Sequence, residues 1–227
     1  MARRACVVLD FDGTILDTEE PVYRSWAELW DEHGQDLVLT EWQAVIGTTG
    51  VFDPWTELQA RVGADLDPSL LDRRRARRDV LLAAHHPRPG ILDWLADAER
   101  RGVPVGIASS SPAEWVGRHL DRLGLRDRFG CLVGCGGTVP VKPDPTSYRL
   151  ACERLGAEPS RSVAVEDSPH GVTAAVAAGL FTVAVPHRLT AGLDLSAAHV
   201  VAESLADLPL DEALRRAAHR QPKRTGP

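Results

Sequence analysis

Two aspartates, separated by one residue, directly follow a short apolar segment near the start of the chain. Residues 5–9 include two valines and predict a buried strand, which the turn residue Gly13 ends. Because residues two apart on a strand point the same way, Asp10 and Asp12 present two carboxylates at the carboxyl end of this strand. Two ionised carboxylates at close range repel unless a cation joins them or one holds a proton. The spacing therefore predicts metal or proton-transfer chemistry, and the alternative is an ordinary solvated acidic turn.

Other reactive side chains follow later apolar segments. They are Ser109 and Ser110 after residues 103–108, Lys142 in the loop after residues 131–133, and Glu166 and Asp167 after residues 162–165. Since the carboxyl ends of parallel strands meet at one edge of a sheet, we expect these side chains to lie beside the two aspartates. Only two of the 26 basic residues, Lys142 and Lys223, are lysines. A compact ammonium suits a tight phosphate site, and the alternative is a chance surface lysine.

The chain after residue 89 alternates predicted strands and helices. The strands cover residues 103–108, 131–133, 162–165, 181–185 and 199–202, and the helices cover residues 113–123, 145–155 and a segment ending at residue 178. Such alternation implies right-handed crossovers between parallel strands. The predicted fold class is α/β, a Rossmann-like parallel sheet with helices on both faces.

Residues 18–88 differ from this pattern, because they show helical periodicity and no convincing strand. Proline- and glycine-containing residues 86–90 and the stretch at residues 17–21 are candidate hinges. We therefore expect a catalytic core formed by residues 1–17 and 89–220, with a small helical cap, residues 18–88, inserted over the carboxyl end of the sheet. The polar tail, residues 221–227, is expected to be disordered.

Composition limits the classes of function. The chain has 227 residues and a formal net charge of −6, which argues against a nucleic-acid or anionic membrane surface. No apolar segment approaches the length of a membrane span, and the first predicted strand begins too early for a removable signal. The four cysteines lack paired spacing. We expect a reduced, cytoplasmic protein, monomeric or weakly dimeric.

In order, these segments resemble the four motifs of the haloacid dehalogenase superfamily. The motifs are residues 10–14 (Asp-Phe-Asp-Gly-Thr), Ser109, Lys142 with Pro143, and residues 166–168 (Glu-Asp-Ser) followed by Gly171. The helical insert is similar to the C1-capped subgroup, which includes β-phosphoglucomutase and small sugar-phosphate phosphatases. The resemblance spans about residues 5–185. It implies a phosphoric monoester hydrolase that acts on a small phosphorylated metabolite.

The resemblance also implies roles for individual residues. Asp10 would be the nucleophile that forms an aspartyl-phosphate, and Asp12 the general acid and base. Mg²⁺ would be held by Asp10, the Asp12 backbone carbonyl and Asp167, with Glu166 in direct contact or one layer out. The remaining residues would bind the phosphate, namely Ser109, Ser110, Lys142 and the Gly13 turn.

Other chemistries of the superfamily fit less well. Dehalogenases lack an acid at the position of Asp12, and phosphonate hydrolases need a cap lysine, which residues 18–89 do not contain. A phosphomutase like β-phosphoglucomutase remains an alternative, although it carries His where this chain has Val22 and Arg where this chain has Gly50. A catalytically silent binding protein on this fold is a second alternative.

Several residues of the insert and the hinges have two interpretations. The arginine run at residues 73–78 is a solvated face, unless one arginine enters the cleft and binds an anionic substrate group. Trp42, Phe52 and Trp55 pack the cap core, unless they line the cleft. A surface or helix-capping role is expected for His170, and no metal role is expected for His85 and His86.

Overall fold

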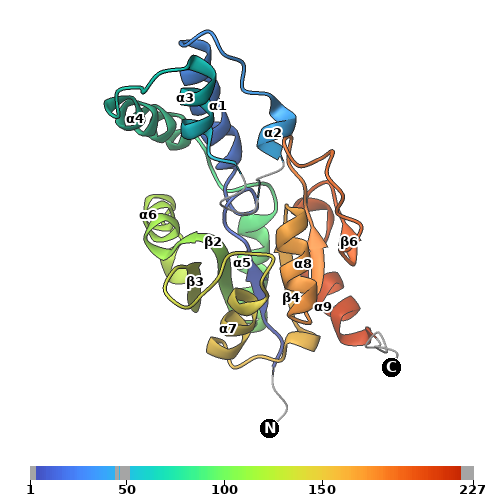
Figure 1. Ribbon diagram of the computed structural model, residues 1–227. Coiled ribbons are helices and arrows are strands. Elements are labelled where there is room, and N and C mark those ends of the chain that lie inside the picture. Colours follow the sequence, from blue (N-terminus) through green and yellow to red (C-terminus); the bar gives the residue numbers. More distant parts are fainter. Residues whose placement is uncertain (1–3, 44–45, 47–51, 221–227) are drawn as a thin grey trace.

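The computed structural model describes residues 4–43, 46 and 52–220. In this part of the chain, six parallel strands form one sheet in the order β3-β2-β1-β4-β5-β6 (Figure 1). The strands are β1 (Val7–Leu9), β2 (Val105–Pro112), β3 (Cys131–Cys135), β4 (Val163–Glu166), β5 (Phe181–Ala184) and β6 (Val200–Val201). The prediction of a Rossmann-like parallel sheet is confirmed.

One strand is longer than predicted. Strand β2 continues through Pro112, which pairs with Cys135 of β3 after a shift of register beyond Ala108. Ser109 and Ser110 therefore lie inside the strand, whereas the sequence placed them after its end. Small polar residues carry no apolar signal, so hydrophobic periodicity could not detect this extension.

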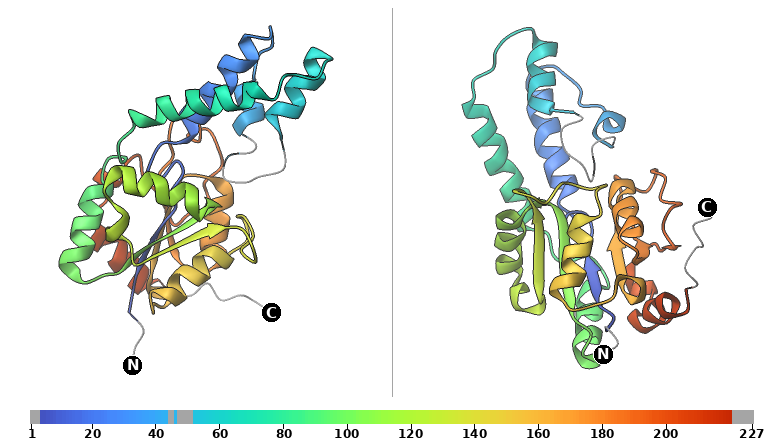
Figure 2. Two further views of the ribbon diagram at one scale, coloured as in Figure 1. Left: turned by 90° about the vertical axis from the view of Figure 1, so that its left-hand side faces the viewer. Right: turned by 60° about the horizontal axis from the view of Figure 1, so that its bottom comes forward.

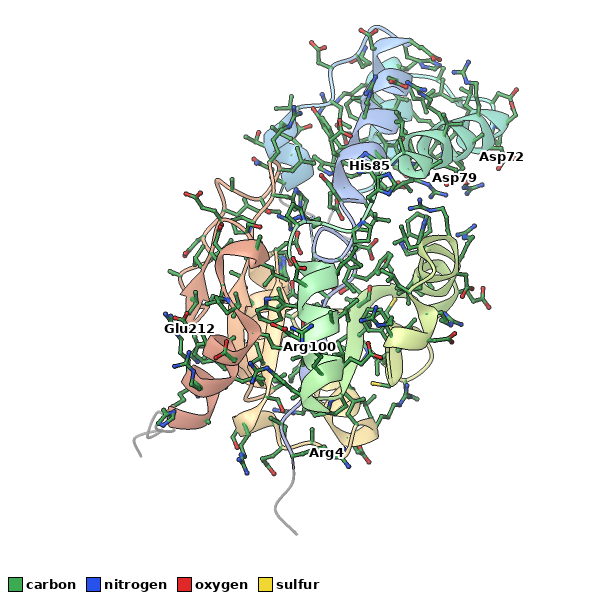
Figure 3. All side chains as sticks on the ribbon, turned by 180° about the vertical axis from the view of Figure 1, so that it is seen from behind. Arg4, Asp72, Asp79, His85, Arg100 and Glu212 are labelled. Atoms are coloured by element: carbon green, nitrogen blue, oxygen red, sulfur yellow. The ribbon has the colours of Figure 1, made fainter. Side chains whose placement is uncertain are left out.

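Helices cover both faces of the sheet. One face packs against α5 (Ile91–Arg101), α6 (Ala113–Leu123) and α9 (Leu210–His219), and the other against α7 (Thr146–Arg154) and α8 (Pro169–Ala177). Strand alternation divides β1 between these layers, because Val7 and Leu9 join the first core and Val8 joins the second. Figure 1 shows α7 and α8 in front, and Figure 3, from behind, shows α5 with Arg100. Short 3-10 helices cover Arg126–Arg128, Pro159–Arg161 and Leu205–Asp207.

Among the described residues, four helices lie between β1 and α5 and form a layer above the sheet (Figure 2). They are α1 (Glu19–Asp31), α2 (Leu39–Gln43), α3 (Pro54–Val62) and α4 (Ser69–Ala83), and we call them the cap helices. They share a hydrophobic core, in which Trp30 and Leu58 are fully buried and to which Leu189, after β5, also belongs. The domain boundaries at residues 17–18 and 88–89 stay a prediction, and the predicted tail lies outside the described residues.

The two connections to the cap helices lie side by side. Leu16 forms an antiparallel bridge with Pro87, and the amide of Arg88 donates to the carbonyl of Ile15 at 2.9 Å. The Arg88 guanidinium donates to the carbonyls of Gly13, Val185 and Pro186. Arg88 thus fastens the second connection to the turn that follows Asp12. None of the described helices is long and apolar enough to cross a membrane.

Candidate active site

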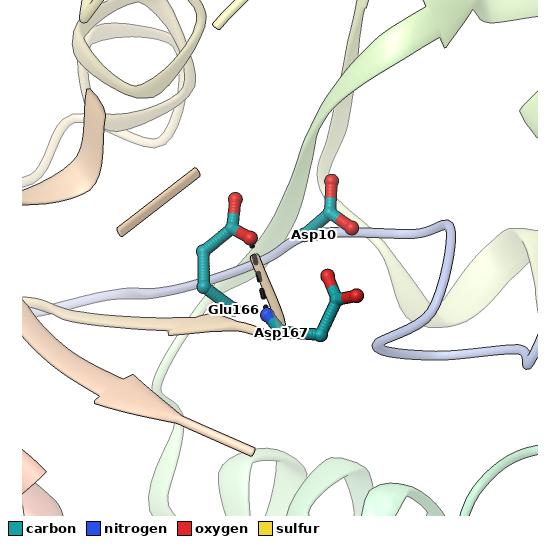
Figure 4. Close-up of side chains that lie close together, drawn as sticks. All are labelled: Asp10, Glu166 and Asp167. Atoms are coloured by element: carbon teal, nitrogen blue, oxygen red, sulfur yellow. Dashed lines mark hydrogen bonds between the residues drawn. The ribbon is translucent and has the colours of Figure 1, made fainter. Parts of the chain in front are cut away.

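Strand register brings the predicted carboxylates together. Leu9 of β1 pairs with Val165 of β4, so the next residues along each strand, Asp10 and Glu166, lie at the same level. The amide of Asp10 donates to the carbonyl of Val165 at 3.0 Å. Carboxylate oxygens of Asp10, Glu166 and Asp167 all lie within 4.8 Å of one another, and all three residues are buried (Figure 4). The predicted acidic cluster is therefore present at the carboxyl edge of the sheet.

Lys142 reaches this cluster from the loop between β3 and α7. Its ammonium donates to the Asp10 carboxylate and, at 2.6 Å, to Oε1 of Glu166. The side chain is only 2% exposed, which contradicts the alternative of a chance surface lysine. Burial lowers the pKa of Lys142, but the carboxylates of Asp10 and Glu166 outweigh this effect, so the net pKa is raised. Lys142 is a buried cation that offsets part of the charge of two buried carboxylates.

The same surroundings act on the nucleophile candidate. Burial raises the pKa of Asp10 well above its usual range, and the carboxylates of Glu166, Asp167 and Asp12 raise it further. Lys142 opposes this rise. Asp10 therefore needs positive charge nearby to be ionised, and hence nucleophilic, at neutral pH.

Donors surround Glu166 on both oxygens. The Tyr148 hydroxyl donates to Oε1 at 2.6 Å, beside the bond from Lys142, while the Asp167 amide donates to Oε2 at 3.2 Å. The Ser168 hydroxyl lies 3.4 Å from Oε2. A Cβ on Gly171 would overlap this carboxyl group, so only glycine at this position leaves room for it. These hydrogen bonds fix the Glu166 carboxylate in the position in which it pairs with Lys142.

Asp167 has a different pair of donors. Thr14 donates to Oδ1 at 3.4 Å, and Nε2 of His187 lies 3.0 Å from Oδ2. The other ring nitrogen of His187 accepts the Leu189 amide at 3.3 Å, which assigns the proton to Nε2. Gly13, at φ +81°, leaves the space that this pair occupies, because a Cβ there would overlap Asp167 and lie 3.0 Å from His187. His187 was not predicted, since a lone histidine after β5 has no recognisable spacing.

Asp12 lies at the same edge but has donors of its own. Oδ1 accepts from Thr18 at 2.8 Å and from the indole N–H of Trp115 at 2.9 Å. Oδ2 lies 3.3 Å from the hydroxyl of Ser109. The Asp12 carboxylate is thus held by groups from the first cap connection, from β2 and from α6.

The predicted phosphate-binding residues lie around these carboxylates, with one difference. Ser109 contacts Asp12, and the Ser110 hydroxyl accepts the backbone amide of Lys142 at 3.2 Å. The amide of Gly13, however, donates to the carbonyl of Leu16 at 2.8 Å, so in this structure it closes the turn. The role of Gly13 that the geometry supports is steric.

The donor set fits a small hard cation. Mg²⁺ prefers carboxylate and carbonyl oxygens and keeps several waters for a bound phosphate. Asp10 and Asp167 both present carboxylate oxygens in the cluster. Asp167 also accepts hydrogen bonds from Thr14 and His187, and such bonds commonly orient a metal-binding carboxylate. Glu166 is already engaged by four donors and suits a position one layer out from the ion.

A further acid, Glu19, lies at the start of α1 close to this cluster. Burial and the nearby carboxylates of Asp12, Asp167 and Asp17 raise the pKa of Glu19 to about 8. Nothing in the sequence distinguishes Glu19 from the neighbouring acids of the first helical turn. Glu19 is thus a residue of the cap helices whose ionisation depends on the nearby carboxylates of Asp12 and Asp167.

The arginine run divides into two groups. Arg73, Arg75 and Arg77 each pair with an acidic side chain, as expected of a solvated face. Arg78 pairs with Asp79, but its side chain is only 16% exposed. Arg74 differs, because it is buried against the Trp26 ring and bonds to the Ser25 hydroxyl at 3.2 Å. Burial lowers the pKa of Arg74 to about 10. Arg74 is thus the one member of this run that lacks a carboxylate partner among the described residues.

The other cap and hinge residues take structural positions. Trp42, Phe52 and Trp55 belong to the hydrophobic core of the cap helices, which favours the packing interpretation. Ser168 caps α8 by accepting the Gly171 amide at 3.2 Å, so His170 is not the capping residue. His85 and His86 join no metal-binding group in the described part of the chain.

Known proteins match nearly the whole chain. A family model described as haloacid dehalogenase-like hydrolase matches residues 5–179. YhcW of Bacillus subtilis (strain 168) is 38% identical over 205 residues, which are 90% of this chain and 93% of YhcW. The fructose-1-phosphate phosphatase YqaB of Escherichia coli (strain K12) is 35% identical over 189 residues, 81% of this chain and 97% of YqaB.

Solved structures agree with these matches. The crystal structure of CbbY from Rhodobacter sphaeroides in complex with phosphate has a TM-score of 0.74 and 30% identity, and the match covers 93% of this chain and 99% of the CbbY chain. The β-phosphoglucomutase of Clostridium difficile has a TM-score of 0.71 at 21% identity, which is a likeness of fold alone. The resemblance stated from the motifs is confirmed.

Proposed function

Because the chain belongs to the haloacid dehalogenase-like hydrolase family, we propose that it hydrolyses a small phosphomonoester through a phosphorylated Asp10. The protein is a phosphoric monoester hydrolase, as its phosphatase relatives indicate. The main support for this mechanism is the buried cluster of Asp10, Glu166 and Asp167, in which the Lys142 ammonium pairs with Asp10 and Glu166. The substrate class, a sugar or polyol phosphate, rests on the names of YqaB and of hexitol phosphatase B.

Two of the chain's own groups carry the covalent steps. A carboxylate oxygen of Asp10 attacks the phosphorus, a new P–O bond forms, and the ester P–O bond breaks. Asp12 gives its proton to the departing alkoxide oxygen. Asp12 then takes a proton from water as this water attacks the phosphorus, which releases inorganic phosphate and restores the Asp10 carboxylate. The net reaction consumes one water.

The remaining residues bind and stabilise charge. An ammonium has three N–H groups, and two of those of Lys142 bond to Asp10 and Glu166, so the third can bond to a phosphate oxygen. Ser110, which accepts the Lys142 backbone amide, and Ser109, which contacts Asp12, can bind other phosphate oxygens. Mg²⁺, held by Asp10, Asp167 and the Asp12 carbonyl, would reduce the repulsion between the anionic nucleophile and the anionic substrate.

The phosphomutase alternative needs a second phosphate held by the cap. Two departures from β-phosphoglucomutase in the insert are Val22, which packs against the core of the cap helices, and Gly50, which lies outside the described residues. Valine offers no hydrogen bond to a phosphate, so this observation favours hydrolysis. A silent binding protein is disfavoured, since Asp10, Asp12 and Lys142 are all retained.

The test is a comparison of products with the purified protein and Mg²⁺. We expect release of inorganic phosphate from fructose 1-phosphate or hexitol phosphates, and loss of this release with EDTA. β-Glucose 1-phosphate serves as the mutase substrate, and isomerisation faster than phosphate release would identify a mutase. A folded protein that releases phosphate from none of these compounds, nor from p-nitrophenyl phosphate, would support the silent binding protein. The cytoplasmic location and the monomeric or weakly dimeric state stay predictions.

A further inference from the structure

We propose that Trp115 is a positioning residue for the proton-transfer step, and that it connects Asp12 to cap helix α4 through Arg78. The proposal rests on the proposed role of Asp12 as the proton carrier. Trp115 belongs to none of the four sequence motifs and is a half-buried residue of α6. Its indole N–H donates to Oδ1 of Asp12 at 2.9 Å.

The arrangement of donors distinguishes the two oxygens of Asp12. Oδ1 accepts two good hydrogen bonds, from Trp115 and from Thr18 at 2.8 Å, whereas Oδ2 has only the longer 3.3 Å contact with Ser109. An indole nitrogen can donate but cannot accept a proton. A proton on Asp12 therefore resides on Oδ2. Trp115 thus fixes both the orientation of the carboxyl group and the oxygen that transfers the proton.

Packing holds the indole in this position. The ring of His119, one turn further along α6, meets the indole edge-on with centroids 4.3 Å apart. His119 in turn stacks on Phe11, which lies between the two catalytic aspartates in the sequence, at 6.1 Å. The donor and the segment that carries its acceptor are therefore packed against one another.

The indole ring also meets the cap, and Arg118 of α6 lies 5.4 Å from its centroid. The Arg78 guanidinium of α4 lies 4.6 Å from the indole centroid, a cation–π distance. Figures 1 and 3 show α4, which carries Asp79, above α6. Arg78 bonds to Asp79 and its side chain is only 16% exposed. A movement of α4 relative to the core would therefore change the contact that supports the Asp12 donor.

The test uses two substrates that differ in their need for a general acid. An alkyl phosphate expels a basic alkoxide and needs the proton, whereas p-nitrophenyl phosphate expels a weakly basic phenolate and needs it little. For Trp115→Phe, which keeps a ring but removes the N–H, we expect kcat/KM to fall about tenfold with the alkyl phosphate and to change little with p-nitrophenyl phosphate. The ratio of kcat/KM for the alkyl phosphate to kcat/KM for p-nitrophenyl phosphate does not depend on the fraction of folded enzyme.

Matched variants complete the experiment. Trp94→Phe removes an indole donor elsewhere in the protein, which bonds to the Leu208 carbonyl, and should leave the ratio unchanged. Asp12→Asn should change the ratio strongly; an unchanged ratio there would contradict the role of Asp12 and so the proposed function. A changed ratio in Asp12→Asn with an unchanged ratio in Trp115→Phe would overturn the proposal for Trp115 alone.

The link to the cap has its own pair of variants. Arg78→Leu should shift the ratio in the same direction as Trp115→Phe, by a smaller factor. Arg77→Leu, on the exposed face of the same helix and paired with Glu28, should not shift it. An unchanged ratio in Arg78→Leu would overturn the connection between Trp115 and the cap.

Discussion

Lys142 donates a 2.6 Å hydrogen bond to Glu166, and both side chains are buried. This contact explains why a lysine is retained in a chain whose other cations in the described residues are arginines. The ammonium lies against Asp10, Glu166 and the Tyr148 ring, and a compact ammonium suits this buried position better than a wide planar guanidinium. The pair positions the cation that opposes the raised pKa of Asp10.

Removal of this cation should reduce both activity and stability. Lys142→Met leaves two buried carboxylates without their partner, so we expect the free energy of unfolding to fall by about 3 kcal/mol. Phosphatase activity should fall at least about 100-fold, because a donor to the phosphate is also lost. Urea unfolding and a phosphate-release assay measure these effects, with exposed Arg101→Met as the control. Near-normal activity in Lys142→Met would contradict the assigned contact with substrate.

His187 should tune the metal site without touching substrate. His187→Ala removes the donor to Oδ2 of Asp167, so we expect Mg²⁺ affinity to weaken about 10- to 100-fold. Calorimetric titration of the protein with Mg²⁺ measures this directly, without an activity assay. His219→Ala, at an exposed position of α9, is the matched control. Equal affinity in the His187 and His219 variants would show that Asp167 does not depend on His187.

Gly171 should tolerate no side chain. In Gly171→Ala, the new Cβ would overlap the Glu166 carboxyl group, so Glu166 must move away from Lys142. We expect activity to fall about tenfold or more, in line with the lost orientation of a buried ion pair. Gly192→Ala, where a Cβ meets nothing within 4 Å, should have wild-type activity. Comparable activities in the two variants would contradict the tight packing over Glu166.

Glu19 should make stability depend on pH when divalent metal is removed by EDTA. Its pKa is raised to about 8 by burial and by Asp12 and Asp167, so the folded state holds a proton that the unfolded state has released. The contribution of this proton to stability is complete below the usual glutamate pKa and is lost as the pH rises through about 8. Glu19→Gln should flatten the fall in thermal midpoint over this range, whereas Glu20→Gln should not. If the thermal midpoint of Glu19→Gln falls with pH as steeply as that of the wild type, Glu19 is not the source of the pH dependence.

The sequence predicted the parts of the molecule that depend on local pattern. Strand periodicity located β1 and β4, and their register then places Asp10 beside Glu166 without further information. Helical periodicity identified the cap helices. The lysine content alone pointed to Lys142, which the structure buries in the predicted cluster.

The missed residues act through tertiary packing. Tyr148 is buried on α7 and Trp115 is half-buried on α6. In a sequence, an aromatic residue on a helix indicates packing and gives no sign that its polar atom meets a carboxylate. His187 depends on a loop after β5, and Glu19 on the proximity of the cap to the core. No spacing rule connects such residues to Asp12 or Asp167, because the fold, and not their separation along the sequence, brings them close.

The central claim is that Asp10 carries the phosphoryl group during turnover. Acid quenching during hydrolysis of a preferred substrate, followed by borohydride reduction and peptide mapping, converts an acyl phosphate on aspartate to homoserine at the modified position. The account predicts this product at residue 10 in the wild-type protein and at no position in a folded Asp10→Asn variant. Modification at another residue, or turnover by Asp10→Asn close to that of the wild type, would contradict it.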